Sequence, residues 1–345
     1  MPPKSKEVVV EKVLLGRPSN NLKIGIVGLP NVGKSTLFNA LTNAGARAEN
    51  FPFCTIEPEE ARVAVPDARF DWLCEKYRPI SKVPAYLTVI DIAGLVKGAS
   101  EGLGLGNAFL SHIRAVDGIF HVVRAFGDEE VLHVEGDVNP VRDLDIIFEE
   151  LRLKDAELLT KALEATRKAL RGHESDKQRQ FEVATLARLH DWVVVQGRQV
   201  RHGEWNAKEV SEVVNGLQLL TAKSAVFLVN VSEREFLERK NRWLGRIKAW
   251  LDEKSPGDTM IPFSGALEGR LGPLPVAEHA AVIQEAMAAQ GLDASVPVPS
   301  SVLPRIITTG YAALQLMYYF TAGREVRAWT VRRGVRAPQD RKSVV

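Results

Sequence analysis

The chain carries the stretch Gly28-Leu29-Pro30-Asn31-Val32-Gly33-Lys34-Ser35, which fits the pattern G-x-x-x-x-G-K-[ST] of a phosphate-binding loop. The apolar run at 23–27 before it predicts a buried strand, and residues 36–41 after it predict the first turns of a helix. Together they form an anion site, because backbone N–H groups line the loop and the helix dipole favours negative charge. We expect Lys34 to reach the β- and γ-phosphates and the Ser35 hydroxyl to bind Mg²⁺.

Composition sets outer limits on the function. The chain has 345 residues, with Lys plus Arg at 45 against Asp plus Glu at 43, so net charge predicts no polyanionic partner. Its two cysteines, Cys54 and Cys74, make no disulfide framework and favour a reducing compartment. No apolar run approaches the ~20 residues needed to span a bilayer. We therefore expect no membrane association and a cytoplasmic location, with a nuclear one left open.

A second motif follows at a distance that suits nucleotide binding. The apolar run at 86–90 predicts a strand that ends in Asp91, and Asp91 with Gly94 gives D-x-x-G. The carboxylate at the end of such a strand holds Mg²⁺, here through water, and the Gly94 N–H is placed to contact the γ-phosphate. Between the two motifs, Thr55 is a candidate switch threonine that would complete the Mg²⁺ shell; an ordinary loop threonine is the alternative.

Recognition of the base is the unusual part of this sequence. The strand predicted at 225–229 precedes Asn230-Val231-Ser232-Glu233, where regulatory GTPases have Asn-Lys-x-Asp. In that pattern the Asp accepts hydrogen bonds from guanine N1–H and the exocyclic amine. Glu233 is one methylene longer, so we expect it to intrude on the guanine edge, whereas adenine has no such donors to satisfy. Unpaired polar groups lower the affinity for the wrong base, so the sequence favours ATP, with a tolerant GTP site as the alternative.

Five segments together resemble the Obg-like ATPases, part of the Obg-related branch of translation-factor P-loop proteins. They are residues 50–58, 91–99, 104–113, 230–233 and 262–268. The resemblance implies a GTPase-type domain that prefers ATP, an inserted helical arm and a C-terminal TGS domain of β-grasp fold. It also implies links to ribosomes, translation control and stress responses.

The same resemblance assigns roles to single residues. It implies phosphate contacts for Asn31, Val32, Gly33, Lys34, Ser35 and Thr36 and Mg²⁺ contacts for Ser35 and Thr55. It implies adenine contacts for Asn230 and Val231, and a last base-side loop that begins at Ser264.

Positioning of the attacking water is incomplete in this sequence. Small GTPases carry a Gln directly after D-x-x-G, but here that position is Leu95, which cannot form a hydrogen bond. Another group must act, and the candidates are the backbone, a partner, K⁺ or a side chain such as His112. Local packing is the alternative role of His112. We therefore expect slow turnover.

The remaining chain divides by pattern. We expect a tail at 1–20, a discontinuous P-loop domain at 21–138 and 221–285, a helical insertion at 139–220, a linker at 286–303, and an incomplete TGS segment at 304–345. Within the insertion, a long helix should follow Asn139-Pro140, and a second should begin near Phe181 and run antiparallel to it.

The C-terminal segment is basic. Its cations are Arg324, Arg327, Arg332, Arg333, Arg336, Arg341 and Lys342. They fit a solvated tail or weak contact with RNA.

These features predict an α/β P-loop fold with a mostly parallel sheet. The expected function is Mg²⁺-dependent ATP binding and slow hydrolysis by a monomer that switches contacts with the ribosome or one of its subunits. Two alternatives stay open: a GTPase of the same branch, and a scaffold that binds ATP with negligible turnover.

Overall fold

A six-stranded sheet lies at the centre of the computed structural model, which describes residues 14–48, 60–92, 106–128, 133, 136–292 and 297–334. The strand order is β2-β4-β1-β5-β6-β7, and every pairing is parallel except that of β2 with β4. The strands are β1 (Lys23–Val27), β2 (Glu60–Ala64), β4 (Tyr86–Asp91), β5 (Gly118–Arg124), β6 (Ser224–Asn230) and β7 (Thr259–Phe263). The predicted mostly parallel α/β sheet is confirmed.

Helices cover both faces of this sheet, which is why its strands are continuous apolar runs. Alternate residues of β6 show the two faces, because successive side chains of a strand point in opposite directions. Leu228 joins the larger core cluster, while Phe227 packs edge-on against Trp250 in a second one. The helices around the sheet are α1 (Lys34–Ala48), α3 (Gly106–Ala115), α8 (Glu233–Leu237), α9 (Leu244–Lys254), α10 (Gly265–Leu271), α11 (Val276–Ala289) and α12 (Leu303–Ala313).

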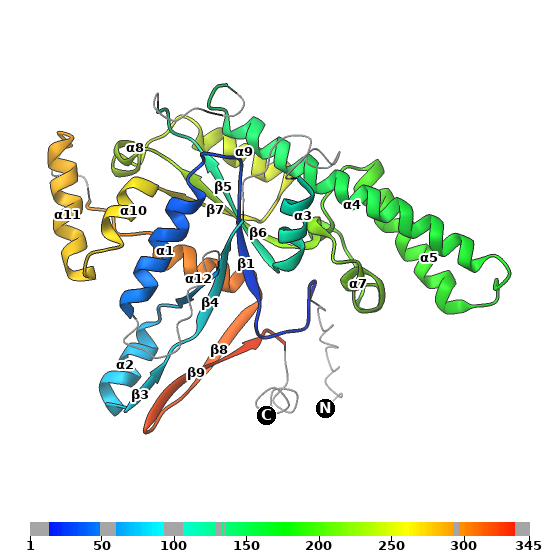
Figure 1. Cartoon of the computed structure of the whole chain (residues 1–345), viewed down its shortest axis with the longest axis horizontal. Helices are drawn as coiled ribbons and strands as arrows, with labels where there is room; N and C mark the ends of the chain where they lie inside the picture. The colour runs from blue at the N-terminus through cyan, green and yellow to red at the C-terminus, as the bar shows by residue number, and fades with distance from the viewer. Residues whose placement is uncertain are drawn as a thin grey trace, which may run out of the picture.

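The helical insertion extends from the sheet as a long hairpin of α4 (Pro140–Leu170) and α5 (Lys177–His190) (Figure 1). Asn139 caps α4, and Pro140 begins it, as the sequence predicts. Asp176 caps α5, so this helix begins four residues before the expected Phe181. The hairpin has its own core of leucines and valines.

Short elements return the chain from α5 to β6. They are η2 (Asp191–Val195, a π-helix), η3 (Val200–His202), α6 (Ala207–Glu209), η4 (Val210–Val214, a π-helix), α7 (Asn215–Leu217) and η5 (Leu220–Ala222). The buried carboxylate of Asp155 fixes this return, since it accepts hydrogen bonds from the N–H groups of Leu220 and Thr221 and from the Thr221 hydroxyl.

The C-terminal segment is divided between the main sheet and a small one. Helix α12 contacts β4, β5 and β6, and its Gly310 approaches Phe120 so closely that a Cβ there would lie 2.3 Å from the ring. The expected boundary at 303/304 therefore falls after the first residue of α12, a helix that belongs to the central core. Strands β8 (Leu316–Thr321) and β9 (Glu325–Arg332) form a hairpin, and β3 (Ser81–Val83) pairs with β9. Helix α2 (Ala68–Tyr77) packs on this small sheet.

Residues 14–21, most of them expected to lie in a tail, are tied to three parts of the molecule. Arg17 forms a bidentate ion pair with Asp117 at the start of β5, and the Gly16 N–H donates to Asn215. The guanidinium of Arg332 donates to the carbonyls of Leu15 and Arg17. Arg332 is thus buried, which corrects its expected place among the solvated or RNA-contacting cations of the C-terminus.

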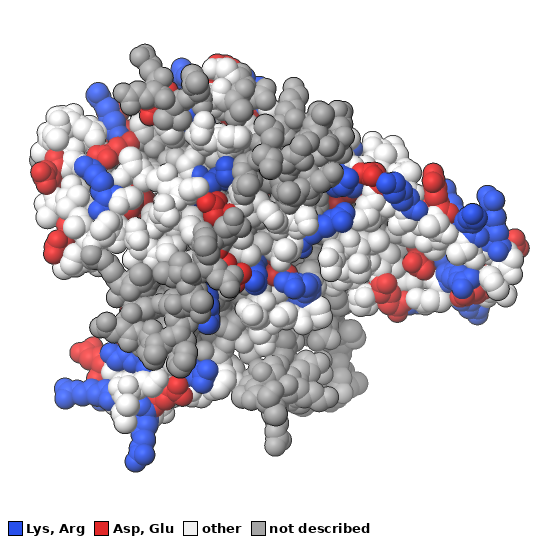
Figure 2. All heavy atoms as spheres, viewed as in Figure 1, with Lys and Arg blue, Asp and Glu red and all other residues white. Residues whose placement is uncertain are grey.

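Charges of both signs are mixed over the visible face of the molecule (Figure 2). Within the described ranges, no helix is both long enough and apolar enough to cross a membrane.

Candidate nucleotide site

The glycine loop joins β1 to α1 at the carboxyl end of the sheet, where ligands of open parallel sheets bind. Two glycines are required by space. A Cβ on Gly28 would lie 2.4 Å from the Val122 carbonyl oxygen, and one on Gly33 would lie 2.4 Å from the Asn230 amide nitrogen. Gly33 also has a φ of +99°, a backbone angle that residues with a side chain rarely adopt. The sequence therefore folds here into a loop that presses its backbone against β5 and β6.

Lys34, the first residue of α1, is held inside this loop. Its side chain is buried, and Nζ donates a hydrogen bond of 2.9 Å to the Leu29 carbonyl. Burial lowers the pKa of the Lys34 ammonium to about 8, although the nearby Asp91 carboxylate opposes that shift. A bound phosphate would supply the negative charge that this loop lacks, so the Lys34 ammonium is placed to bind an anion.

Ser35 and Asp91 meet at the open end of the loop. The Ser35 hydroxyl donates to Oδ2 of Asp91 over 2.8 Å, which joins the first turn of α1 to the end of β4. These hard oxygen ligands suit Mg²⁺, which binds through few protein groups together with water and phosphate oxygens. Across the described residues there is no cluster of three or more His, Cys, Asp or Glu side chains that could hold a metal alone. Mg²⁺ fits this pair, with the nucleotide and water as its other ligands.

Asn230 connects the phosphate loop to the base side. Its Nδ2 donates to the Val32 carbonyl over 3.0 Å, and its Oδ1 accepts from the Gly265 N–H over 2.9 Å. Both polar atoms of this buried amide are therefore bonded to backbone. Ser264 is also buried and caps α10, with its hydroxyl accepting from the Leu267 N–H. Asn230 thus aligns two loops, and a direct adenine contact by its side chain stays a prediction.

Val231 and Glu233 take positions that the sequence pattern does not reveal. Val231 is buried in the second core cluster, so only its backbone can face a base. The carboxylate of Glu233 accepts from Nη2 of Arg270 over 2.7 Å and from Nε2 of Gln290 over 3.1 Å. The expected intrusion of Glu233 on the guanine edge is replaced by an ion pair directed toward α10 and the end of α11. Arg270 and Gln290 were missed because no local motif marks them.

The remaining predicted residues divide into three groups. Thr36 and Asn31 lie in the exposed part of the loop and first turn, and Asn31 has a φ of 61°. Thr55 and Gly94 lie outside the described residues, as does Leu95. His112 is in the last turn of α3 with an exposed side chain, and no described residue forms a hydrogen bond with it. Its role in catalysis therefore stays a prediction.

Comparisons with known proteins agree with this geometry. A family model described as "50S ribosome-binding GTPase" matches residues 23–161. "Obg-like ATPase 1" of Schizosaccharomyces pombe is 54% identical over 344 residues, covering 98% of this chain and 84% of that protein. "Obg-like ATPase 1" of Homo sapiens is 52% identical over 343 residues, covering 98% and 83%.

Solved structures give the same result. "Structure of the Schizosaccharomyces pombe YchF GTPase" aligns with a TM-score of 0.83 and 54% identity, covering 95% of this chain and 85% of that one. A GTP-binding protein from Pyrococcus horikoshii, at 17% identity and a TM-score of 0.52, covers 91% and 87% and shows the shared fold alone.

Proposed function

The chain belongs to the Obg-like ATPase (YchF) family of P-loop GTPase-like nucleotide hydrolases, and from that premise we propose that it binds ATP with Mg²⁺ in preference to GTP. One observation carries the proposal. The only acidic side chain of the Asn230–Glu233 segment is already bonded to Arg270 and Gln290.

Guanine recognition needs an acceptor for two donors, N1–H and the 2-amino group. The Glu233 carboxylate is committed to an ion pair whose two side chains are 50% and 19% exposed, with Glu233 the more buried. Turning it toward guanine would leave the Arg270 guanidinium without its partner, and leaving it in place would leave the guanine donors unpaired. Adenine presents neither donor at these positions, so it loses nothing. The preference for ATP thus comes from the ion pair that already engages the Glu233 carboxylate, and not from the length of the Glu233 side chain alone.

The phosphate end supports hydrolysis with Mg²⁺. Lys34 is buried and its pKa is lowered to about 8, and Ser35 and Asp91 supply oxygen ligands for Mg²⁺. We propose that turnover is slow, because Leu95 cannot orient water, and that Thr55, Gly94 and His112 complete the reacting end. K⁺ is a further candidate for the charge that positions water.

A GTPase is the second candidate, since one solved relative is titled a GTPase while curated relatives are named ATPases. The description of the matching family model supports a ribosomal partner. We propose that the nucleotide state controls contact with the ribosome in the cytoplasm, with stress regulation as its outcome and the monomer as the active form.

Competition between ATP and GTP tests the proposal directly. Purified protein with Mg²⁺ and a fluorescent ATP analogue is titrated with each nucleotide. We expect at least about tenfold tighter binding of ATP, or ~1.4 kcal/mol, which is within reach of one or two mismatched hydrogen bonds. Equal affinities would support the GTPase candidate. Single-turnover hydrolysis with and without ribosomes then separates a switch from a scaffold, because a scaffold shows no turnover in either case.

A further inference from the structure

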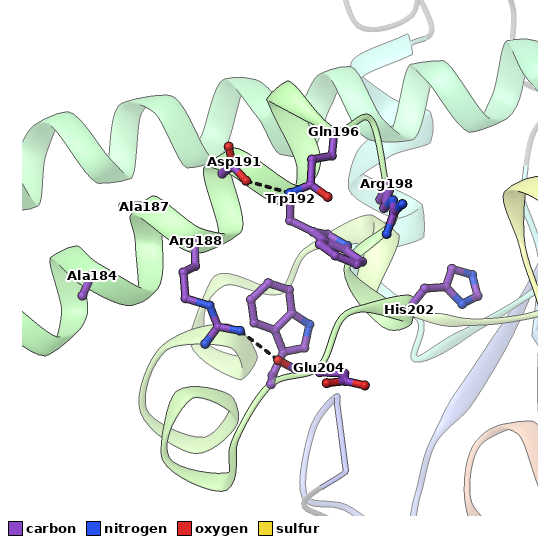
Figure 3. Close-up of a pocket in the computed structure, with 10 residues that line it drawn as sticks. Ala184, Ala187, Arg188, Asp191, Trp192, Gln196, Arg198, His202 and Glu204 are labelled. Atoms are coloured by element: carbon purple, nitrogen blue, oxygen red, sulfur yellow. Dashed lines mark hydrogen bonds between the residues drawn. The ribbon is translucent and has the colours of Figure 1, made fainter.

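A cavity lies entirely on the helical insertion and is separate from the phosphate loop. Its volume is about 750 Å³, within the range in which proteins bind small ligands. Residues of α5 and η2 form one wall, and residues 196–205 form the other (Figure 3). Nothing in the proposed hydrolysis uses this cavity, so its residues require their own explanation.

Two tryptophans are fixed in the walls. Nε1 of Trp192 donates to the Gln199 carbonyl over 2.9 Å, and Nε1 of Trp205 donates to the Val200 carbonyl over 2.8 Å. The rings meet edge to face, with centroids 6.2 Å apart and planes at 80°. Both indole N–H groups are therefore satisfied within the protein, and the half-buried rings offer preorganised apolar surface to a planar ligand.

Cations lie beside both rings. The guanidinium of Arg188 is 5.2 Å from the Trp205 ring and is held by the Glu209 carboxylate and the Glu204 carbonyl. The guanidinium of Arg198 is 4.9 Å from the Trp192 ring, and within the described part of the chain it pairs with no carboxylate. Arg198 thus keeps its donors for a ligand, while Arg188 serves as part of the wall.

The backbone that carries Trp192 is irregular. Helix α5 changes at Asp191 into the π-helix η2, which carries Trp192, and a second π-helix, η4, contacts α5. Such π segments are rare and concentrate at functional sites. Here the change of helix type places Trp192 opposite Trp205 rather than continuing the regular face of α5.

The chemistry of the walls distinguishes between ligands. A methylated ammonium ligand is disfavoured, because it would bring a third cation beside Arg188 and Arg198, which already lie over the two rings. Two rings beside an available guanidinium instead suit a flat base with an attached phosphate, because bases stack on both aromatic rings and guanidinium planes.

We propose that this cavity binds an unpaired nucleotide unit, with its base stacked on the ring of Trp192, its edge toward Trp205 and its phosphate held by Arg198. The unit is either a free nucleotide or one unpaired nucleotide of an RNA. The visible face of the insertion mixes both signs of charge (Figure 2), so the proposed binding is local to the cavity and does not depend on a broad basic surface.

Binding of a short fluorescein-labelled oligouridylate to the full chain, followed by fluorescence anisotropy, tests the proposal. We expect Trp192→Leu to weaken binding at least about fivefold, the lower end for loss of one stacked base, while Trp192→Phe retains most of it. Arg198→Glu should weaken binding at least about tenfold. The matched control is Arg167→Glu, an exposed arginine of α4 outside the cavity, which should change binding less than about twofold.

Further measurements separate this site from the phosphate loop and identify the source of the nucleotide. Lys34→Ala should leave oligouridylate binding unchanged, so failure of the ATP proposal would not affect this result. ATP binding and thermal unfolding report whether each cavity variant is folded. Displacement of the oligonucleotide by uridine monophosphate would assign the cavity to free nucleotides, and its absence would assign it to RNA. No binding, or equal losses for Arg198→Glu and Arg167→Glu, would overturn the proposal.

Discussion

The two ends of the nucleotide site use their polar groups differently. At the phosphate end, Lys34 is bonded to a carbonyl of its own loop and Ser35 to Asp91, so each group has one partner that a ligand can replace. At the base end, Asn230 and Glu233 are bonded to groups on separate elements. A bound phosphate can therefore replace hydrogen-bond partners that Lys34 and Ser35 already have. The groups expected to select the base, in contrast, also hold the loops together.

The largest effect should come from the phosphate end. Lys34→Ala removes a charged donor, and such bonds are each worth about 1.5–3 kcal/mol. We expect ATP and GTP affinity to fall together by at least about a hundredfold, while urea unfolding without nucleotide shows no loss of stability. Calorimetric titration measures the first and circular dichroism the second. Normal ATP affinity in the folded variant would exclude this loop as the site.

Asn230→Ala tests the framework. It would leave the Val32 carbonyl and the Gly265 N–H without their buried partner, at a cost of about 2 kcal/mol in the free energy of unfolding. Exposed Asn39→Ala on α1 is the matched control and should change stability by less than about 0.5 kcal/mol. If both variants unfold at the same urea concentration, the amide is not a structural connection and the contrast between the two ends fails.

Changes at the Glu233 ion pair should alter base preference more mildly. Glu233→Asp shortens the side chain away from Arg270 and Gln290, so its carboxylate becomes available to guanine donors. We expect the ATP-to-GTP affinity ratio to shift toward GTP by up to about tenfold, and Arg270→Ala to shift it less in the same direction. The control is Arg234→Ala on α8, which pairs with Glu238 instead. Val231→Lys, which Asn-Lys-x-Asp suggests, would bury a charge in the core and is unsuitable.

The outcomes of the ion-pair experiment differ clearly. A shift in both Glu233→Asp and Arg270→Ala supports commitment of the carboxylate as the cause of selectivity. A shift in neither, with ATP still preferred, would mean that backbone groups near Ser264 choose the base.

The smallest expected effect is a dependence on pH. The folded pKa of Lys34, about 8, lies below its ordinary 10.5 because the ammonium is buried. Above pH 8 the free protein must take up a proton to bind phosphate, so ATP affinity should fall about fourfold between pH 7 and 8.5. Unfolding also takes up a proton between these two pKa values, so the Lys34 contribution to stability rises with pH there. Lys34→Arg should bind ATP equally at both pH values; a parallel decline would assign the titration elsewhere.

Local patterns predict the nucleotide domain well. The expected strands at 23–27 and 86–90 agree with β1 and β4 to within one residue, because apolar runs and glycine turns are local signals. The beginning of α5 was harder to predict, since the cap Asp176, five residues before Phe181, outweighs the position of the first apolar residue.

Contacts between distant segments could not be predicted in this way. Glu233 meets Arg270 across 37 positions, and Arg332 meets Leu15 across 317. Such pairs depend on how elements are placed in three dimensions, and neither has a periodic or spacing signature. Likewise, α12 reads as part of a C-terminal segment, although its apolar face and Gly310 fit the central sheet.

The contacts of Arg332 have a mechanical consequence. Its guanidinium donates hydrogen bonds to the carbonyls of Leu15 and Arg17. The first and last described parts of the chain are therefore linked to each other. Tension applied between residues 14 and 334 would be carried first by these few hydrogen bonds and the Arg17–Asp117 pair. They would yield before the parallel strands slide past one another. As long as they hold, these contacts keep a pull on the two ends from reaching β1 and the glycine loop that follows it.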